Sequence, residues 1–219
     1  QDYTSYNREN QRYELRSSYA SNPRIIWNLH ASLRRDNTFD YEFEESGVVS
    51  DQNKRYVYTA EPGLQYVINE RNTLDFDFFY KQADNESGSA ADYWSSGGTI
   101  LWSRSLMDEK SYLLSGIRIE QTEFDLQPGD GTQTVYASFV GWSRDLGPRL
   151  NVTLKAGPTW TESEFDRTTG RDSGNEVGMN LETQLFWQFT EQTDVTLSAD
   201  HGQYQSIYAE NITRSRIRS

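Results

Sequence analysis

The sequence lacks several of the residues on which protein chemistry most often depends. Its 219 residues include no cysteine, which excludes disulfides, thiol nucleophiles and thiolate metal centres. Only two histidines and two methionines are present as further soft or imidazole ligands. Basic residues are outnumbered, with 21 lysines and arginines against 33 acids and a formal charge of -12. Because a nucleic-acid-binding protein needs a basic surface to neutralise phosphates, we expect no nucleic acid among its partners.

Long apolar runs are also missing. No stretch approaches the roughly 18 consecutive apolar residues of a membrane-spanning helix, and the mean hydropathy is -0.84. Only 35% of the residues are hydrophobic, yet 14% are aromatic, including 6 Trp and 14 Tyr. Disordered chains are poor in aromatic residues, so this composition indicates a folded protein.

Apolar and polar residues alternate with period two along most of the chain, and amphipathic-helix spacing is nearly absent. The alternation is clearest in residues 25–34, 74–81, 150–156, 177–189 and 195–200. Successive side chains of a strand point to opposite faces, so each segment has one apolar and one polar face. The pattern predicts an all-β protein.

The predicted connections alternate in length. Short ones are expected at residues 21–23, 69–72, 107–110, 147–148 and 190–193, and longer polar ones roughly at 45–54, 83–92, 125–133 and 163–175. The strands between them run to about 12–14 residues, which suits the strands of a transmembrane β-barrel with short periplasmic turns and long outer loops. A soluble β-sandwich and a lipocalin-like barrel are the alternatives.

The aromatic residues favour the membrane barrel. One band lies near the short turns and includes Trp27, Tyr66, Trp102, Tyr112, Trp142, Trp187 and Phe189. A second lies near the long loops and includes Tyr41, Phe43, Tyr56, Tyr58, Tyr80, Tyr93, Trp94, Phe124, Tyr136 and Trp160. Two aromatic bands flanking an aliphatic belt are typical of the two membrane–water interfaces.

The direction of the strands leads to an expectation about the ends. If the short turns are periplasmic, the strand from about residue 10 to 20 runs inward, so at least one strand should precede it. At the other end Thr213, Ser215 and Ile217 alternate with arginines, which indicates a strand that is cut short. We expect a single antiparallel up-and-down transmembrane β-barrel domain over residues 1–219. About ten strands should be visible, and the parent barrel should be even-numbered with at least twelve.

Several short segments carry a family resemblance, in this order: YTSYNREN at 3–10, YELR at 13–16, SNP at 21–23, LRRD at 33–36, YVINERNTL at 66–74 and NITRSRI at 211–217. Together they resemble the outer-membrane β-barrel porins encoded beside exopolysaccharide synthesis and export genes in Gram-negative bacteria. The resemblance covers most of the chain as a pattern and not as a sharp motif. It implies a secreted-polysaccharide context and supplies no catalytic residue.

Alternation also assigns side chains to the two faces. Predicted to line the lumen are Asn28, His30, Arg34, Asp75, Asp77, Phe79, Lys81, Arg118, Glu120, Lys155, Glu182 and Asp200. Predicted to face lipid or to form the aromatic bands are Trp27, Leu29, Phe76, Phe78, Tyr80, Trp102, Val152, Leu154, Trp160, Leu185 and Trp187. The inward-facing rings of Phe79 and Phe186 are candidates for stacking on sugars or for contacting a folded-in loop.

No constellation for covalent chemistry emerges. Asp75 and Asp77 follow a short turn, whereas His201 is about eight residues beyond its own short turn, roughly 25 Å higher at 3.3 Å per residue. These groups cannot share one substrate. We therefore expect no enzyme, no catalytic residue, no metal and no cofactor.

The sequence thus predicts an outer-membrane pore for passive passage of polar solutes, with saccharide or exopolysaccharide export as a specific form. Its partners would be outer-membrane lipid and lipopolysaccharide, with polysaccharide or export-machinery proteins as further candidates. Two alternatives stay open: a closed structural or adhesion barrel that contacts a partner through acidic outer loops, and a soluble carbohydrate-binding β-sandwich.

Overall fold

The computed structural model describes residues 11–37, 54–86, 92–125, 129–167, 170–190, 193–204 and 212–218. These residues form the strands β1 (Gln11–Asn22), β2 (Ile25–Asn37), β3 (Lys54–Asn69), β4 (Asn72–Asn85), β5 (Asp92–Ser105), β6 (Ser111–Asp125), β7 (Asp130–Gly147), β8 (Leu150–Arg167), β9 (Gly170–Gln188), β10 (Asp194–Tyr204) and β11 (Ile212–Arg218). None of the described residues forms a helix long and apolar enough to cross a membrane.

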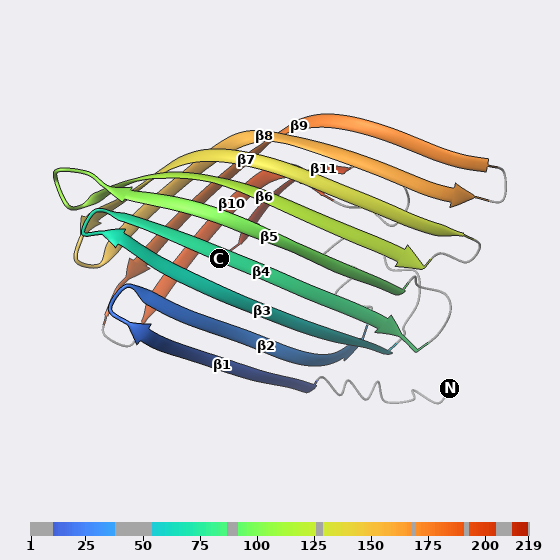
Figure 1. Cartoon of the computed structure of the whole chain (residues 1–219), viewed down its shortest axis with the longest axis horizontal. Coiled ribbons are helices and arrows are strands. Elements are labelled where there is room, and N and C mark those ends of the chain that lie inside the picture. Colours follow the sequence, from blue (N-terminus) through green and yellow to red (C-terminus); the bar gives the residue numbers. More distant parts are fainter. Residues whose placement is uncertain are drawn as a thin grey trace, which may run out of the picture.

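The strands make one 11-stranded sheet in which each strand pairs with the next in the chain. Every pairing is antiparallel, so the sheet is an up-and-down meander. The sheet curls, so that β10 and β11 pass behind the front strands in Figure 1. β1 and β11 stand at its two edges. The predicted all-β antiparallel architecture is confirmed.

The short connections lie together at one end of the sheet, on the left of Figure 1, which we call the short-turn end. They join β1 to β2, β3 to β4, β5 to β6, β7 to β8 and β9 to β10, as the sequence predicts. The opposite end is the long-loop end. The loop predicted at 45–54 and its aromatics Tyr41 and Phe43 lie outside the described residues.

Two of the predicted long loops are wrong. The β6–β7 ladder continues to the pair Asp125–Asp130, and the β8–β9 ladder continues to Arg167–Gly170. Most of residues 125–133 and 163–175 therefore belongs to strands, with β9 reaching 19 residues. At 3.3 Å per residue such a strand is about 60 Å long, much longer than the bilayer core is thick. Beyond the core, both faces of a strand can be polar, which gives it the composition of a loop.

Most of the buried side chains of the described sheet lie on its concave side toward the long-loop end, whereas Leu114 and Ser111 are buried near the β5–β6 turn. Val57, Ala83, Phe124 and Phe165 are buried at the long-loop end. The Phe124 ring lies 6.4 Å from that of Phe165 and 6.2 Å from that of Tyr93. Polar neighbours are buried with them: Arg55, Thr122, Gln133 and Thr161. This end of the interior is filled by its own side chains.

The predicted aromatic bands therefore need a correction. The register pairs Tyr93 with Phe124, and both lie on the concave side and not on the outer surface. Tyr112 pairs with Ser143 and shares that side. Adjacent aromatics such as Tyr93 and Trp94 break the alternation, so the sequence does not reveal which of the two faces outward.

The convex side, in contrast, carries large apolar side chains that remain exposed. About half of the surface of Trp27, Phe78 and Trp160 is exposed, and more than half of that of Ile117 and Val140. A protein in water rarely leaves a continuous apolar surface of this extent uncovered. The convex side is therefore suited to contact with lipid.

Three strand glycines allow close approach on the concave side. A Cβ atom at Gly97 would lie 2.6 Å from Cε1 of Phe79, and one at Gly116 would lie 2.9 Å from Cε1 of Phe139. At Gly157 it would overlap the Ser138 carbonyl oxygen. Glycine inside a strand often marks such a close approach. At Gly97 and Gly116 a phenyl ring occupies the space that a side chain would take, and at Gly157 the backbone of β7 does.

Gly157→Ala should destabilise the barrel because its methyl group would meet the backbone of β7, with Phe139 Cα 2.7 Å away. We expect a loss of about 1–3 kcal/mol in the free energy of unfolding. Urea titration of the protein in detergent micelles measures it. Gly174→Ala is the control, since its Cβ would meet nothing within 4 Å, and its effect should stay within about 0.5 kcal/mol. Equal effects of the two variants would contradict the packing argument.

The β5–β6 turn is organised by Asp108. Its Oδ1 accepts the backbone N–H groups of Lys110 (3.2 Å) and Ser111 (2.9 Å), and its Oδ2 accepts the Ser111 hydroxyl (2.7 Å). The Ser111 hydroxyl and these N–H groups hold the pKa of the exposed Asp108 below its ordinary value. Glu109, between them, has a left-handed backbone with φ of 54°.

The turn should therefore lose stability in acid. A lowered folded-state pKa means that the stabilisation is complete above the unfolded-state pKa and is lost as the pH falls through the folded-state pKa. Asp108→Ala should have a lower urea midpoint of unfolding than the wild type at about pH 6. The midpoints of the two proteins should converge as the pH falls toward about pH 2. Urea titrations across this range test it. A gap that stays constant with pH would show that the ionised carboxylate is not responsible.

Candidate functional site

The register sorts the candidate residues between the two sides of the sheet, since directly paired residues point to the same side. One unbroken row across five strands runs Asn28, Gly63, Asp77, Thr99 and Arg118. All the residues predicted to line the lumen share the side of this row, which we call the inner face. All those predicted to face lipid lie on the other side, the outer face.

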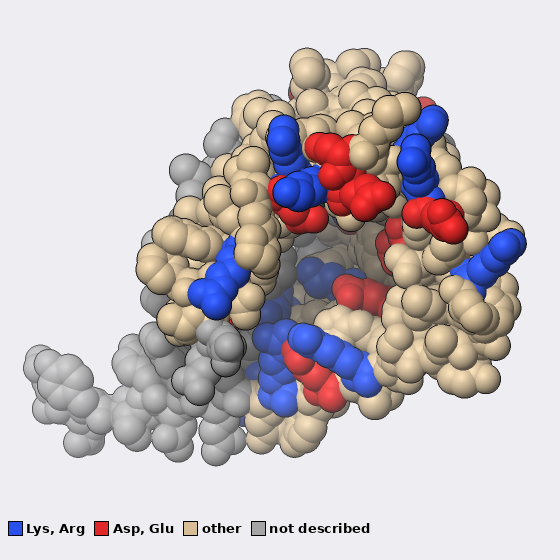
Figure 2. All heavy atoms as spheres, turned by 90° about the vertical axis from the view of Figure 1, so that its left-hand side faces the viewer, with Lys and Arg blue, Asp and Glu red and all other residues tan. Residues whose placement is uncertain are grey.

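The inner face encloses a hollow. Figure 2 views the short-turn end and shows a depression whose wall carries side chains of both charges. No single sign of charge dominates the wall in this view.

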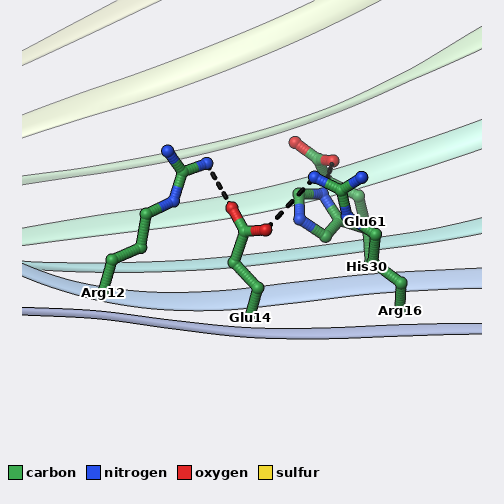
Figure 3. Close-up of polar contacts among 5 residues, drawn as sticks. All are labelled: Arg12, Glu14, Arg16, His30 and Glu61. Carbon is green, nitrogen blue, oxygen red and sulfur yellow. Dashed lines mark hydrogen bonds and ion pairs between the residues drawn. The ribbon is translucent and has the colours of Figure 1, made fainter. Parts of the chain in front are cut away.

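The first charged group lies on β1, β2 and β3. Glu14 forms ion pairs with Arg12 and with Arg16, the second at 3.2 Å. Next to Arg16 in the register is His30, whose Nδ1 lies 2.8 Å from Oε2 of Glu61. All five side chains project from the same side of the strands, toward the interior (Figure 3). Arg12, Glu14, Arg16 and Glu61 extend the predicted set.

His30 is held by this arrangement. The Glu61 carboxylate accepts a hydrogen bond at Nδ1, which places a proton on that nitrogen. Its Nε2 is shielded from solvent, and no described residue provides it with a hydrogen-bond partner. The geometry is that of a fixed wall residue.

A second group lies on β3 to β6. The Gln65 amide donates a hydrogen bond to Asp75 Oδ1 (2.8 Å). Arg118 forms a close ion pair with Glu120, and its guanidinium carbon lies 5.8 Å from the centre of the Phe79 ring. The Phe79 ring, with Gly97 beneath it, is engaged by Arg118 and offers little free surface for stacking.

The third group lies on β8, β9 and β10. Lys155 Nζ lies 3.1 Å from Glu182 Oε1, and Glu182 pairs in the register with Asp200. Lys155 also lies 5.8 Å from the centre of the Phe139 ring. The sequence does not predict Phe139 as an inner residue, because apolar side chains occupy both sides of β7 there. The glycine opposite it, Gly116, is the only sequence signal that could have found it.

At the short-turn end, β7 and β8 carry a hydrogen-bonded polar network that sequence reasoning also misses. The Asn151 amide donates to Asp145 Oδ1 (2.8 Å) and to Ser143 Oγ (3.2 Å). The hydroxyl oxygens of Ser143 and Thr153 lie 2.8 Å apart. Alternating polar residues on facing strands were the available signal.

The structure does not bring the remaining acid and histidine candidates together. Asp75 and Asp77 lie on the inner face of β4, whereas His201 pairs with Leu181 and lies on the outer face of β10. Within the described residues, no group of three or more histidine, aspartate and glutamate side chains could hold a metal ion.

No family model matches the chain, and no curated protein matches it in sequence. Among solved structures it is similar to the unliganded ferric citrate transporter FecA (TM-score 0.54, 16% identity, 89% of this chain and 35% of that chain). It is also similar to a ferric enterobactin receptor, PfeA, from Pseudomonas aeruginosa (TM-score 0.56, 11% identity, 89% of this chain and 37% of that chain). A third similar structure is the ferric-catecholate import receptor Fiu from E. coli K12 (TM-score 0.52, 9% identity, 97% of this chain and 49% of that chain).

The chain spans about a third to a half of the length of these proteins. Identities this low show the fold alone, and the fold is that of Gram-negative outer-membrane β-barrels. The predicted transmembrane β-barrel class is confirmed, with the described strands forming an open sheet. The exposed apolar outer face and this similarity agree with the predicted outer-membrane location.

The two faces can be told apart by labelling. Cysteine introduced as Asp77→Cys should react with a membrane-impermeant polar thiol reagent in whole outer membranes, because that side chain faces the hollow. Phe76→Cys, one residue away on the outer face, should react much more slowly because lipid covers it. Since the chain has no native cysteine, mass spectrometry gives the labelled fraction without background. The reverse order of reactivity would show that the faces are exchanged.

Proposed function

We propose that this chain forms the wall of an outer-membrane pore through which polar solutes, saccharides in particular, pass without covalent chemistry or a cofactor. The observation that supports this most directly is the pairing of charges along the inner face. Arg16 with Glu14, Arg118 with Glu120 and Lys155 with Glu182 each place opposite signs side by side. The electrostatic potentials of two neighbouring opposite charges largely cancel at a distance from the pair.

Such a wall favours neutral polar solutes. A wall of one sign of charge would concentrate ions of the other sign, whereas this one offers hydrogen-bond donors and acceptors in alternation. Sugars carry many hydroxyls that both donate and accept hydrogen bonds. The similar structures are named as ferric citrate, ferric enterobactin and ferric-catecholate proteins, and their cargo is a competing expectation for this chain.

A closed barrel is the second candidate, and one observation favours it. The buried cluster of Phe124, Phe165 and Val57 fills the inner face toward the long-loop end. A barrel narrowed by its own side chains would be a structural or adhesion element and not a passage. Outer-membrane lipid and lipopolysaccharide would be its neighbours in either case.

Conductance in planar lipid bilayers separates the two candidates. Full-length protein that forms a pore should give stepwise ionic currents, and a closed barrel should give none. Preparations should first be shown to be folded by the heat-dependent shift of their electrophoretic mobility. Folded protein without any channel current would refute the pore.

Two matched substitutions then test whether the inner face lines the conducting path. Lys155→Gln leaves Glu182 without its cation and should shift selectivity toward cations. Glu182→Gln leaves Lys155 unpaired and should shift it toward anions. Reversal potentials in a potassium chloride gradient measure both. Shifts in the same direction, or none, would place these residues outside the path.

A further inference from the structure

One part of the inner face is built differently from the rest. At the short-turn end, Asp145, Asn151 and Phe186 form one row across β7, β8 and β9. They line a groove of about 520 Å³ together with the turn residues Lys110 and Arg149. Phe186 is 40% exposed and stands among polar side chains.

The other inner phenyl rings toward this end are occupied. Phe79 lies over Gly97 and under Arg118, and Phe139 lies over Gly116 and beside Lys155. Among the described residues, no ring or cation stacks on Phe186 in this way. Its ring is therefore available to a ligand, whereas those of Phe79 and Phe139 are not.

The polar groups beside this ring are fixed in position. The side-chain amide of Asn151 donates to Asp145 Oδ1 (2.8 Å), and the Thr153 hydroxyl donates to the side-chain oxygen Oδ1 of Asn151 (3.2 Å). On β7 to β10 the next row inward holds four uncharged polar residues, Ser143, Thr153, Gln184 and Ser198. An exposed ring thus borders a pre-organised field of amide, carboxylate and hydroxyl groups.

We propose that this groove is a saccharide-binding subsite at the short-turn end of the barrel. A sugar ring has an apolar C–H face, which can stack on the Phe186 ring, and hydroxyls at its edge. Asp145, which Asn151 holds in place, stands where its carboxylate can accept hydrogen bonds from those hydroxyls. Unlike the charge-balanced wall beyond it, the groove has two cations at its rim, Lys110 and Arg149, and one acid, Asp145, which suits a sugar residue carrying a carboxylate. The subsite rests on the proposed passage of saccharides and gives it a specific place of recognition.

The test measures binding of defined probes to the full-length protein in detergent micelles. Maltohexaose, cellohexaose and a galacturonic acid hexamer are offered separately, and saturation-transfer NMR detects the bound sugar. Phe186→Ala is compared with Phe189→Ala, a matched control in the same hairpin whose ring packs 4.0 Å from that of Trp187. Phe186→Trp restores a ring. The mobility shift on heating confirms that each variant is folded.

We expect at least one probe to bind the wild type, with the galacturonic acid hexamer the strongest. Affinity should fall about tenfold in Phe186→Ala, as the loss of one stacking contact would produce. It should stay unchanged in Phe189→Ala and return in Phe186→Trp. Binding that survives Phe186→Ala, an equal loss in Phe189→Ala, or no binding of any probe would overturn the subsite.

The same preparations keep this proposal separate from the pore. Channel current without oligosaccharide binding would leave the pore standing and overturn the subsite. Oligosaccharide binding that depends on Phe186, without channel current, would support the subsite and refute the pore.

Discussion

The structure depends on the ladders of backbone hydrogen bonds that pair each strand with the next, from β1 to β11. In the hydrocarbon of a bilayer no water is available to pair with backbone groups, and each unpaired group costs several kcal/mol. The ladders satisfy these groups between neighbouring strands, and they leave the side chains to alternate between two sides. The outer face can then be apolar while the inner face stays polar, which reconciles a low hydrophobic content with a membrane protein.

The inner face differs along the direction of the strands. Toward the long-loop end it is filled by buried side chains such as Phe124 and Phe165, and toward the short-turn end it surrounds a hollow. Charges occur as opposite-sign neighbours, either along one strand or across two, so the wall is polar without a strong field of one sign. In the proposed pore, the packed end would control passage, and the proposed subsite lies at the open end.

Alternation is a strong predictor only where the two sides of a strand differ. It assigns Trp27 and Asn28, or Phe76 and Asp77, to opposite faces, and the register agrees. It fails at Phe139, where both sides of the strand carry apolar residues. It also fails at the ends of β6 to β9 nearest the long-loop end. There both sides of a strand are polar, so the strand has the composition of a loop.

The sequence by itself determined the period of the strands, hence the all-β class, the positions of the short turns and the two faces, because these follow from local alternation. The tertiary structure alone decided which residues become neighbours across strands. Phe186 lies beside Asn151, and Lys155 beside Glu182, because the hydrogen-bond ladder sets the register between strands. No local pattern encodes a pairing between residues that are 27 or more positions apart. The wall of the hollow, its paired charges and the position of Phe186 beside its polar neighbours are therefore products of register.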